Sequence, residues 1–358
     1  MPERADSRGD RARRHHRVAG AALSAPLGVL AVFLPAAPAT AADAYGAPTT
    51  RCEITDERLP ELSGLVGIGD GVLAMNDGGD QAEVFALDGA CAVVEVRTAP
   101  VDPYDPEDLA VGPDGTVWLA DIGDNDQGRE TVALIGLRPD GSSTLTRLTY
   151  PDGAHDAEAL LMAPDGTPYL VTKEVLGASS VYRPDEPLAD GATLPMTRVL
   201  GMGFTLTGTP GGPVGRAGQL LVTGGAVSRD GQRIALRTYT DAYVWPLTDS
   251  DVAGALGGSP VRVPLPDSPQ GEAIAFAGND RDLLVSSEGL PAALTLVPVA
   301  ADLAPAPAAD TPDGEGDGAA AAVDLTGGVN PVTAGVVAAG VATVLVWVGG
   351  RLRRRREG

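Results

Sequence analysis

Acidic residues recur along the chain at the ends of short apolar runs, where they could bind a cation. Glu107, Glu158 and Glu272 each open such a run, whereas Asp121 closes one and Asp124 follows it closely. Ca²⁺ prefers about six to eight oxygen ligands, so carboxylates gathered at one place would favour it. We predict a Ca²⁺ site, with Mg²⁺ as the alternative ion, formed by Glu107, Asp121, Asp124, Glu158 and Glu272.

Three basic residues lie in the same repeated units and could bind an anionic ligand. They are Arg129, Lys173 and Arg237, and Lys173 is the only lysine of the chain. The alternative is purely structural: the acids would accept hydrogen bonds from backbone N–H groups and pair with these cations. The sequence alone leaves both interpretations open.

Several other catalytic and binding motifs are absent. Neither Asp121 nor Asp124 begins an EF-hand, which requires glycine at the sixth position and glutamate at the twelfth. No G-x-S-x-G elbow of an α/β-hydrolase occurs. Three histidines and two cysteines exclude a Cys/His zinc cluster. His155 could be a general base or a ligand, and the alternative is a hydrogen-bonded loop histidine.

The acids belong to a repeated unit that reads acid, apolar strand, Gly/Asp turn and second strand ending in an acid. Four stretches follow this order, and a fifth, 223–241, lacks the leading acid. The four are 61–77, 107–121, 158–174 and 272–288. Asp-Gly between apolar runs is typical of a β-hairpin. The turn aspartates are Asp70, Asp114, Asp165, Asp230 and Asp280.

Further strands follow each predicted hairpin, for example 83–87 and 93–97 after the first. Four-stranded repeats of this length are typical of propeller blades. We predict an all-β fold, a β-propeller of five four-stranded blades over residues 42–300. Six blades are the alternative, because 191–222 could hold an extra blade or a long loop. The strand at 52–55 is expected to complete the last blade. A β-sandwich would not explain the recurrence.

Blade geometry predicts where the acids meet. The second strand of a blade runs back alongside the first, so the start of one and the end of the other lie on the same face. Acids from different blades should therefore surround one mouth of the central channel. Those expected beside the predicted ligands are Asp77, Glu174, Asp241 and Glu288.

The N-terminal residues 1–41 read as a secretory signal peptide. Six arginines precede a mostly apolar run at 18–34, and Ala39-Thr40-Ala41 supplies a small-x-small cleavage pattern. We expect Sec export, with twin-arginine export as the alternative. Secretion implies an oxidising compartment, so Cys52 and Cys91 are predicted to form a disulfide. Two free buried thiols are the alternative.

The C-terminal region reads as a membrane anchor. Residues 301–330 form an Ala/Pro/Gly/Asp-rich stalk, 331–350 carry no charge, and 351–358 are arginine-rich. About 20 uncharged residues are enough for a transmembrane helix, and the arginines belong on the cytoplasmic side. We predict a single-pass type I protein of the cell membrane with an extracellular ectodomain. Sortase anchoring near 323–327 is the alternative.

A net charge of −22 excludes the usual nucleic-acid-binding protein, which needs a basic surface. The expected partners are the membrane, through the C-terminal helix, and an extracellular ligand or protein that the sequence does not identify.

Five short motifs resemble secreted actinobacterial propeller proteins labelled WD40-like or phytase/esterase-like. The motifs are Ser63-Gly64-Leu65, Asn76-Asp77, Asp105-Pro106-Glu107-Asp108, Asp121–Asn125 with Arg129, and Arg237–Asp241. The resemblance covers about residues 51–300 and implies the propeller fold.

Two functions are consistent with these features. The first is a membrane-anchored binding or sensing module that uses an acidic, Ca²⁺-loaded face. The second, implied by the phytase-like resemblance, is a Ca²⁺-dependent phosphoesterase in which metal ions activate water. Arg129, Lys173 and Arg237 would then hold the substrate phosphate.

Overall fold

A computed structural model describes residues 45–300 of the chain. The predicted signal peptide (1–41), stalk (301–330), transmembrane helix (331–350) and tail (351–358) lie outside the described residues. Within residues 45–300, no helix is both long enough and apolar enough to cross a membrane.

The described residues are almost entirely β-sheet, as predicted. One four-stranded sheet has the order β2 (Leu62–Ile68), β3 (Gly71–Asn76), β4 (Ala82–Leu87), β5 (Val93–Ala99). Another runs β14 (Val222–Val227), β15 (Arg233–Thr238), β16 (Asp241–Pro246), β17 (Val261–Pro264). A further sheet contains β18 (Ile274–Phe276), β19 (Leu283–Val285), β20 (Ala292–Val297) and β1 (Thr49–Ile54).

The largest sheet has eight strands and consists of two antiparallel runs. The first run is β6 (Pro106–Val111), β7 (Val117–Asp121), β8 (Val132–Leu137), β9 (Ser143–Thr149). The second is β10 (Ala157–Met162), β11 (Pro168–Thr172), β12 (Ser180–Pro184), β13 (Thr193–Gly201). They are joined by a parallel pairing of β13 with β9, for example Leu194 with Leu148.

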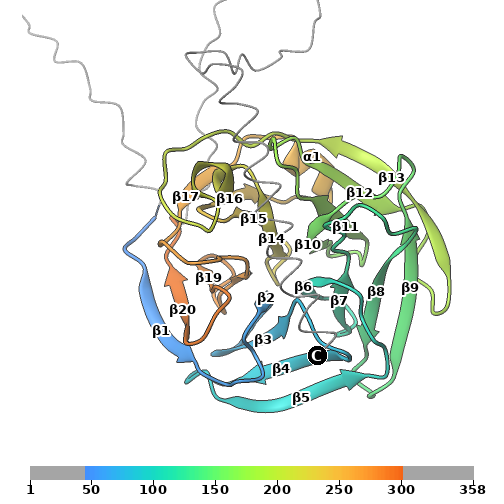
Figure 1. Cartoon of the computed structure of the whole chain (residues 1–358), viewed down its shortest axis with the longest axis horizontal. Helices are drawn as coiled ribbons and strands as arrows, with labels where there is room; N and C mark the ends of the chain where they lie inside the picture. Colours follow the sequence, from blue (N-terminus) through green and yellow to red (C-terminus); the bar gives the residue numbers. More distant parts are fainter. Residues whose placement is uncertain (1–44, 301–358) are drawn as a thin grey trace, which may run out of the picture. The chain divides into compact units, whose positions relative to one another are not determined.

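The first strands of these runs form a closed ring around a common centre. β2 contacts β6, β6 contacts β10, and β10 contacts β14 (Figure 1). β14 contacts β18, and β18 contacts β2 and closes the ring. Asp108 on β6 links three of them, because its buried carboxylate accepts hydrogen bonds from the N–H groups of Leu109, Leu160 and Gly225. A ring of meandering sheets around an axis is the architecture of a β-propeller.

The ring is closed by a strand from the beginning of the described chain. β1 pairs antiparallel with β20, with Cys52 opposite Leu294. This pairing confirms that the strand at 52–55 completes the last sheet. The disulfide between Cys52 and Cys91 is also confirmed, with an S–S distance of 2.03 Å. Cys91 lies in the turn between β4 and β5, so the bond ties the closing strand to the first sheet.

The hairpin turns follow the predicted Asp-Gly chemistry. Gly115, Gly166 and Gly231 adopt φ values of 81°, 87° and 67°, a left-handed region that suits glycine. The aspartate before each of them accepts a hydrogen bond from the N–H group two residues ahead. These short-range bonds help to fix the register of these three hairpins.

The 191–222 interval contains no additional sheet. The first part of the interval is β13, the last strand of the second run, and residues 202–221, which include the 3₁₀ helix η2 (Gly215–Gln219), connect β13 to β14. A second short helix, α1 (Val252–Leu256), was not anticipated from the sequence. It is capped by Asp251, whose carboxylate accepts a hydrogen bond from the N–H group of Gly254.

Candidate functional site

One end of the ring gathers acidic side chains from several sheets. Glu107 and Glu158 are the second residues of β6 and β10, and Glu272 lies two residues before β18. Asp77 follows β3 and Lys173 follows β11. Strand starts and strand ends therefore meet at one mouth of the channel, as blade geometry predicts.

An inner acid group is formed by Glu107, Asp156 and Glu158. Each offers a carboxylate oxygen, and these oxygens lie within 4.8 Å of one another. All three residues are buried, at 5%, 8% and 1% exposure. Asp156 was not among the ligands predicted from the sequence. The signal that could have indicated it is its position two residues before Glu158, directly before β10.

The Glu158 carboxylate is only half satisfied. Its Oε1 accepts a hydrogen bond of 2.5 Å from Nζ of Lys173. Its Oε2 is buried and has no hydrogen-bond partner among the described residues. Asp156 Oδ1 accepts a hydrogen bond from the N–H group of Asp124. The inner acid group therefore keeps a buried carboxylate oxygen, Glu158 Oε2, that could accept another hydrogen bond or bind a cation.

Burial dominates the titration of these groups. It raises the pKa of Glu158 to about 8, against the lowering effect of Lys173. It also raises the pKa of Glu107 well above its usual range and raises that of Asp156. Burial lowers the pKa of Lys173, but Glu158 and nearby acids outweigh this and raise it overall. The lysine therefore stays charged, and burial favours the protonated form of the acids over the ionised form unless a second cation offsets their charge.

An outer acid group consists of Asp77, Glu272 and Glu288, with carboxylate oxygens also within 4.8 Å of one another. Gln270 Nε2 donates to Oε1 of both Glu272 and Glu288, at 3.3 and 2.6 Å. The hydroxyl of Tyr239 donates to Glu272 Oε1 at 3.3 Å. Burial and the neighbouring Glu272 raise the pKa of Glu288 to about 12, so Glu288 carries a proton at neutral pH.

Asp121 and Asp124, two of the predicted ligands, lie outside both acid groups. Asp121 Oδ1 accepts hydrogen bonds from two backbone N–H groups and pairs with Arg129 at 2.9 Å. Asp124 accepts hydrogen bonds from the N–H groups of Gly128 and Arg129. Both carboxylates shape the loop after β7. Of the five predicted ligands, the structure places Glu107 and Glu158 in the inner group and Glu272 in the outer group.

The three predicted ligand-binding cations are all engaged by protein groups. Arg129 binds Asp121 and the carbonyl of Gly123, and Lys173 binds Glu158. Arg237 is fully buried and donates to backbone carbonyls, including that of Ala273 at 2.6 Å. Burial lowers its pKa to about 10. Arg237 therefore links β15 to the neighbouring sheet.

Gly123 permits the close approach of Glu107 to the loop after β7. A Cβ atom at this position would collide with the carboxylates of Glu107 and Asp105. The absence of a side chain therefore leaves the volume that the Glu107 carboxylate occupies. This makes Gly123 part of the site.

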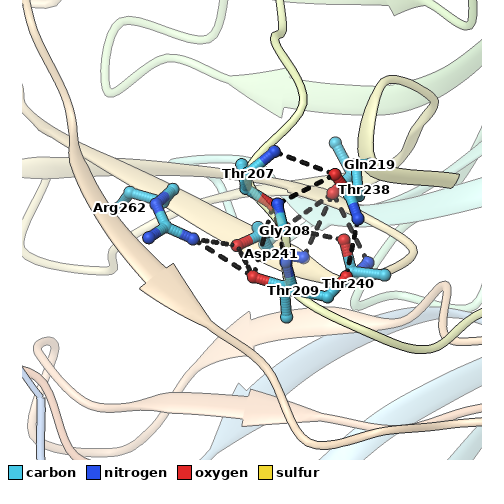
Figure 2. A network of polar contacts seen from close by, with 8 residues as sticks. All are labelled: Thr207, Gly208, Thr209, Gln219, Thr238, Thr240, Asp241 and Arg262. Atoms are coloured by element: carbon cyan, nitrogen blue, oxygen red, sulfur yellow. Dashed lines mark hydrogen bonds and ion pairs between the residues drawn. The ribbon is translucent and has the colours of Figure 1, made fainter. Parts of the chain in front are cut away.

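Asp241 anchors the long 202–221 connection beside the site. Its fully buried carboxylate accepts hydrogen bonds from the hydroxyls of Thr207, Thr209 and Thr240, and it pairs with Arg262 at 2.6 Å (Figure 2). Gly212 and Gly218 of this connection pack against Tyr239. Asp241 thus holds the connection against a residue that contacts the outer acid group.

His155 has the hydrogen bonds of a structural loop histidine. Its Nε2 lies 3.0 Å from both Asp152 Oδ1 and the hydroxyl of Tyr182. The ring of Tyr150 packs against it edge-on. His155 therefore holds the loop that leads into β10.

Comparison with known proteins does not assign the chain to a family. No family model matches the chain, and no curated protein matches it. Among solved structures, a gluconolactonase from Xanthomonas campestris is 16% identical, with a TM-score of 0.41 over 74% of this chain and 94% of that one. The apo-form soluble aldose sugar dehydrogenase from Escherichia coli is 11% identical, with a TM-score of 0.37 over 71% and 99%. Such values assign no activity.

Proposed function

We propose that this chain is a Ca²⁺-binding β-propeller that acts as an extracellular binding or sensing module. The observation that carries the proposal is Glu158 Oε2, a buried carboxylate oxygen that has no hydrogen-bond partner within residues 45–300 and lies beside the oxygens of Glu107 and Asp156. Leaving such an acceptor unpaired costs roughly 1–3 kcal/mol, more when it is charged. A bound ion removes this cost.

Charge supports a divalent ion. Three ionised carboxylates and the Lys173 ammonium leave a net charge of two negative units in the inner acid group. One Ca²⁺ ion balances this charge and accepts oxygen ligands in flexible geometry, with waters filling the remaining positions. Mg²⁺ demands stricter octahedral geometry and retains its waters, so Ca²⁺ is the better match.

The hydrogen bonds and ion pairs of the three basic residues favour a binding function over a phosphoesterase. Arg129, Lys173 and Arg237 are each committed to protein acceptors, so none of them is available to neutralise a phosphate. Release of phosphate from p-nitrophenyl phosphate with and without Ca²⁺ separates the two functions. We expect no Ca²⁺-dependent release; a rate abolished by Glu158→Gln would support the phosphoesterase instead.

We further propose five blades, counting the two antiparallel runs of the eight-stranded sheet as separate blades. The ring of first strands β2, β6, β10, β14 and β18 supports this count. The sequence of residues 1–41 and 331–358 supports export and a single membrane anchor. In that arrangement the acid groups would face an extracellular ligand.

Calorimetric titration of the full chain with CaCl₂ tests the ion site. We expect saturable binding that is lost in Glu158→Gln and weakened in Glu107→Gln. Glu95→Gln is the matched control, because Glu95 is exposed on β5, away from the acid groups, and its carboxylate pairs with the nearby Arg97. Equal binding by the wild type and Glu158→Gln would disprove the site.

A further inference from the structure

The end of the ring that carries the acid groups also exposes apolar side chains. The loops at this end join the second strand of each run to the third, and each run of strands to the next. Exposed apolar side chains gathered on one face typically mark an interaction surface. Five large ones lie in these loops, each exposed by 37% to 74%, and together we call them the apolar collar: Tyr104, Val175, Leu176, Leu206 and Leu290.

Backbone contacts bring two loops of the apolar collar together. The N–H group of Phe204 donates to the carbonyl of Gly177 at 2.8 Å. A Cβ atom at Gly177 would lie 2.7 Å from the carbonyl oxygen of Phe204, so glycine permits this approach. The loop that carries Val175 and Leu176 is therefore held against the connection that carries Leu206.

Acidic residues lie beside three parts of the apolar collar. The neighbours along the chain are Tyr104 with Asp105, Glu174 with Val175, and Glu288 with Leu290. The Asp105 carboxylate lies near that of Glu107, because a Cβ atom at Gly123 would meet both. Glu288 belongs to the outer acid group. The collar and the acids therefore occupy one continuous mouth.

The outer acid group has no cation of its own within residues 45–300. Lys173 and Arg129, two basic residues of this mouth, pair with Glu158 and Asp121 instead. The carboxylate of Asp77 has neither a hydrogen bond nor an ion pair with another described residue.

The titration of Asp77 reflects this missing cation. Burial and the nearby Glu272 raise the pKa of Asp77 well above its usual range. Protons therefore occupy the outer acid group when no cation is present. Asp77 and Glu288 are partly exposed, unlike the inner acid group, so a positively charged side chain can reach them and replace the protons.

We propose that this mouth binds a segment of a partner protein in which one basic residue is flanked by apolar residues. This partner class rests on the extracellular binding function proposed above. The basic side chain enters the outer acid group, and the flanking residues cover the apolar collar. The net charge of −22 attracts such a segment from a distance. Apolar burial supplies most of the affinity, and the carboxylates select the basic residue.

Selection of random heptapeptides displayed on phage, with the immobilised full chain as target, tests this surface. We expect enriched sequences with one Lys or Arg and with apolar residues within two positions of it. A synthetic peptide of the enriched sequence should bind at least about tenfold more weakly when glutamine replaces its basic residue, because a charge-assisted contact is lost.

Three variants locate the binding of that peptide. Asp77→Asn should weaken it about as much as the glutamine replacement does, and Leu176→Ser should weaken it several-fold. Val94→Ser is the matched control, because Val94 is 66% exposed at the start of β5, near the opposite end of the ring. The control should bind the peptide like the wild type.

Several results would overturn this partner class. They are the absence of any enriched sequence, enrichment of acidic or wholly apolar peptides, and equal peptide binding by the wild type, Asp77→Asn and Leu176→Ser. A wild-type dimer that Leu176→Ser converts to a monomer in sedimentation would also overturn it, because the face would then bind a second copy of the chain.

Calorimetric titration of the same proteins with CaCl₂ separates this inference from the ion site. Leu176→Ser should bind Ca²⁺ like the wild type while it loses peptide affinity. Saturable Ca²⁺ binding without an enriched peptide would refute the partner class and leave the ion site intact. Enriched basic peptides without Ca²⁺ binding would support the partner class and refute the ion site.

Discussion

Removal of the Cys52–Cys91 disulfide should destabilise the domain strongly, because this bond holds the strand that closes the ring. The two cysteines are 39 residues apart, and a loop of this length corresponds to about 4 kcal/mol in the chain-entropy model. For a domain the size of residues 45–300, each kcal/mol shifts the Tm by roughly 2–4 °C. We expect Cys52→Ala/Cys91→Ala to lower the Tm by about 8–16 °C.

Guanidinium unfolding of the double variant and of reduced wild type measures this effect. The reduced protein retains both sulfur atoms and so separates the cross-link from the packing of the buried Cys91 side chain. Hydrogen exchange should increase first in β1 and β20, which form the closing pair. A loss below about 1 kcal/mol in both proteins would refute the closing role of the disulfide.

Three further outcomes follow from the central residues. Asp108→Asn should cost about 1–3 kcal/mol in chemical unfolding, because an amide has one acceptor oxygen and at least one of the three N–H groups would face its NH₂. A neutral result would contradict the linking role of Asp108. Without Ca²⁺, the folded state keeps a proton on Glu158 up to about pH 8, whereas the unfolded chain loses it near the ordinary value of 4.5. Stability should therefore fall from pH 5 to pH 8, by at most about 4 kcal/mol, in a series of melts; a rise would contradict the buried state of Glu158. Lys173→Met should raise the Ca²⁺ affinity at least about tenfold in calorimetry, because the inner acid group loses its only paired cation; a lower affinity would contradict the charge balance.

Local turn chemistry made much of the fold predictable. Asp-Gly turns and apolar runs located the first hairpins, because a glycine with positive φ and an aspartate bonded two residues ahead act within the turn. The closing strand was predictable because the last repeat lacked one strand. The parallel pairing of β13 with β9 was not, since it joins two runs through no local signal.

The residues that form the site were also harder to predict, because no local sequence signal indicates which side chains meet there. Glu107 and Asp121 occupy equivalent ends of adjacent strands, but Arg129 pairs with Asp121 and leaves Glu107 in the inner group. Asp156 belongs there through a hydrogen bond from Asp124, which lies in the loop of another run. Strand position predicts the face on which an acid lies. The side chains that it meets there are decided by contacts between segments distant in sequence and by the loops that follow the strands.

The most direct test of the ion site is a crystal structure grown at about pH 8 with CaCl₂ and measured for anomalous scattering. We expect one peak among Glu107, Asp156 and Glu158, with their oxygens about 2.3–2.6 Å away and Lys173 still paired to Glu158. A peak only at Asp121 or Asp124, or none at saturating calcium, would disprove the proposed Ca²⁺ site.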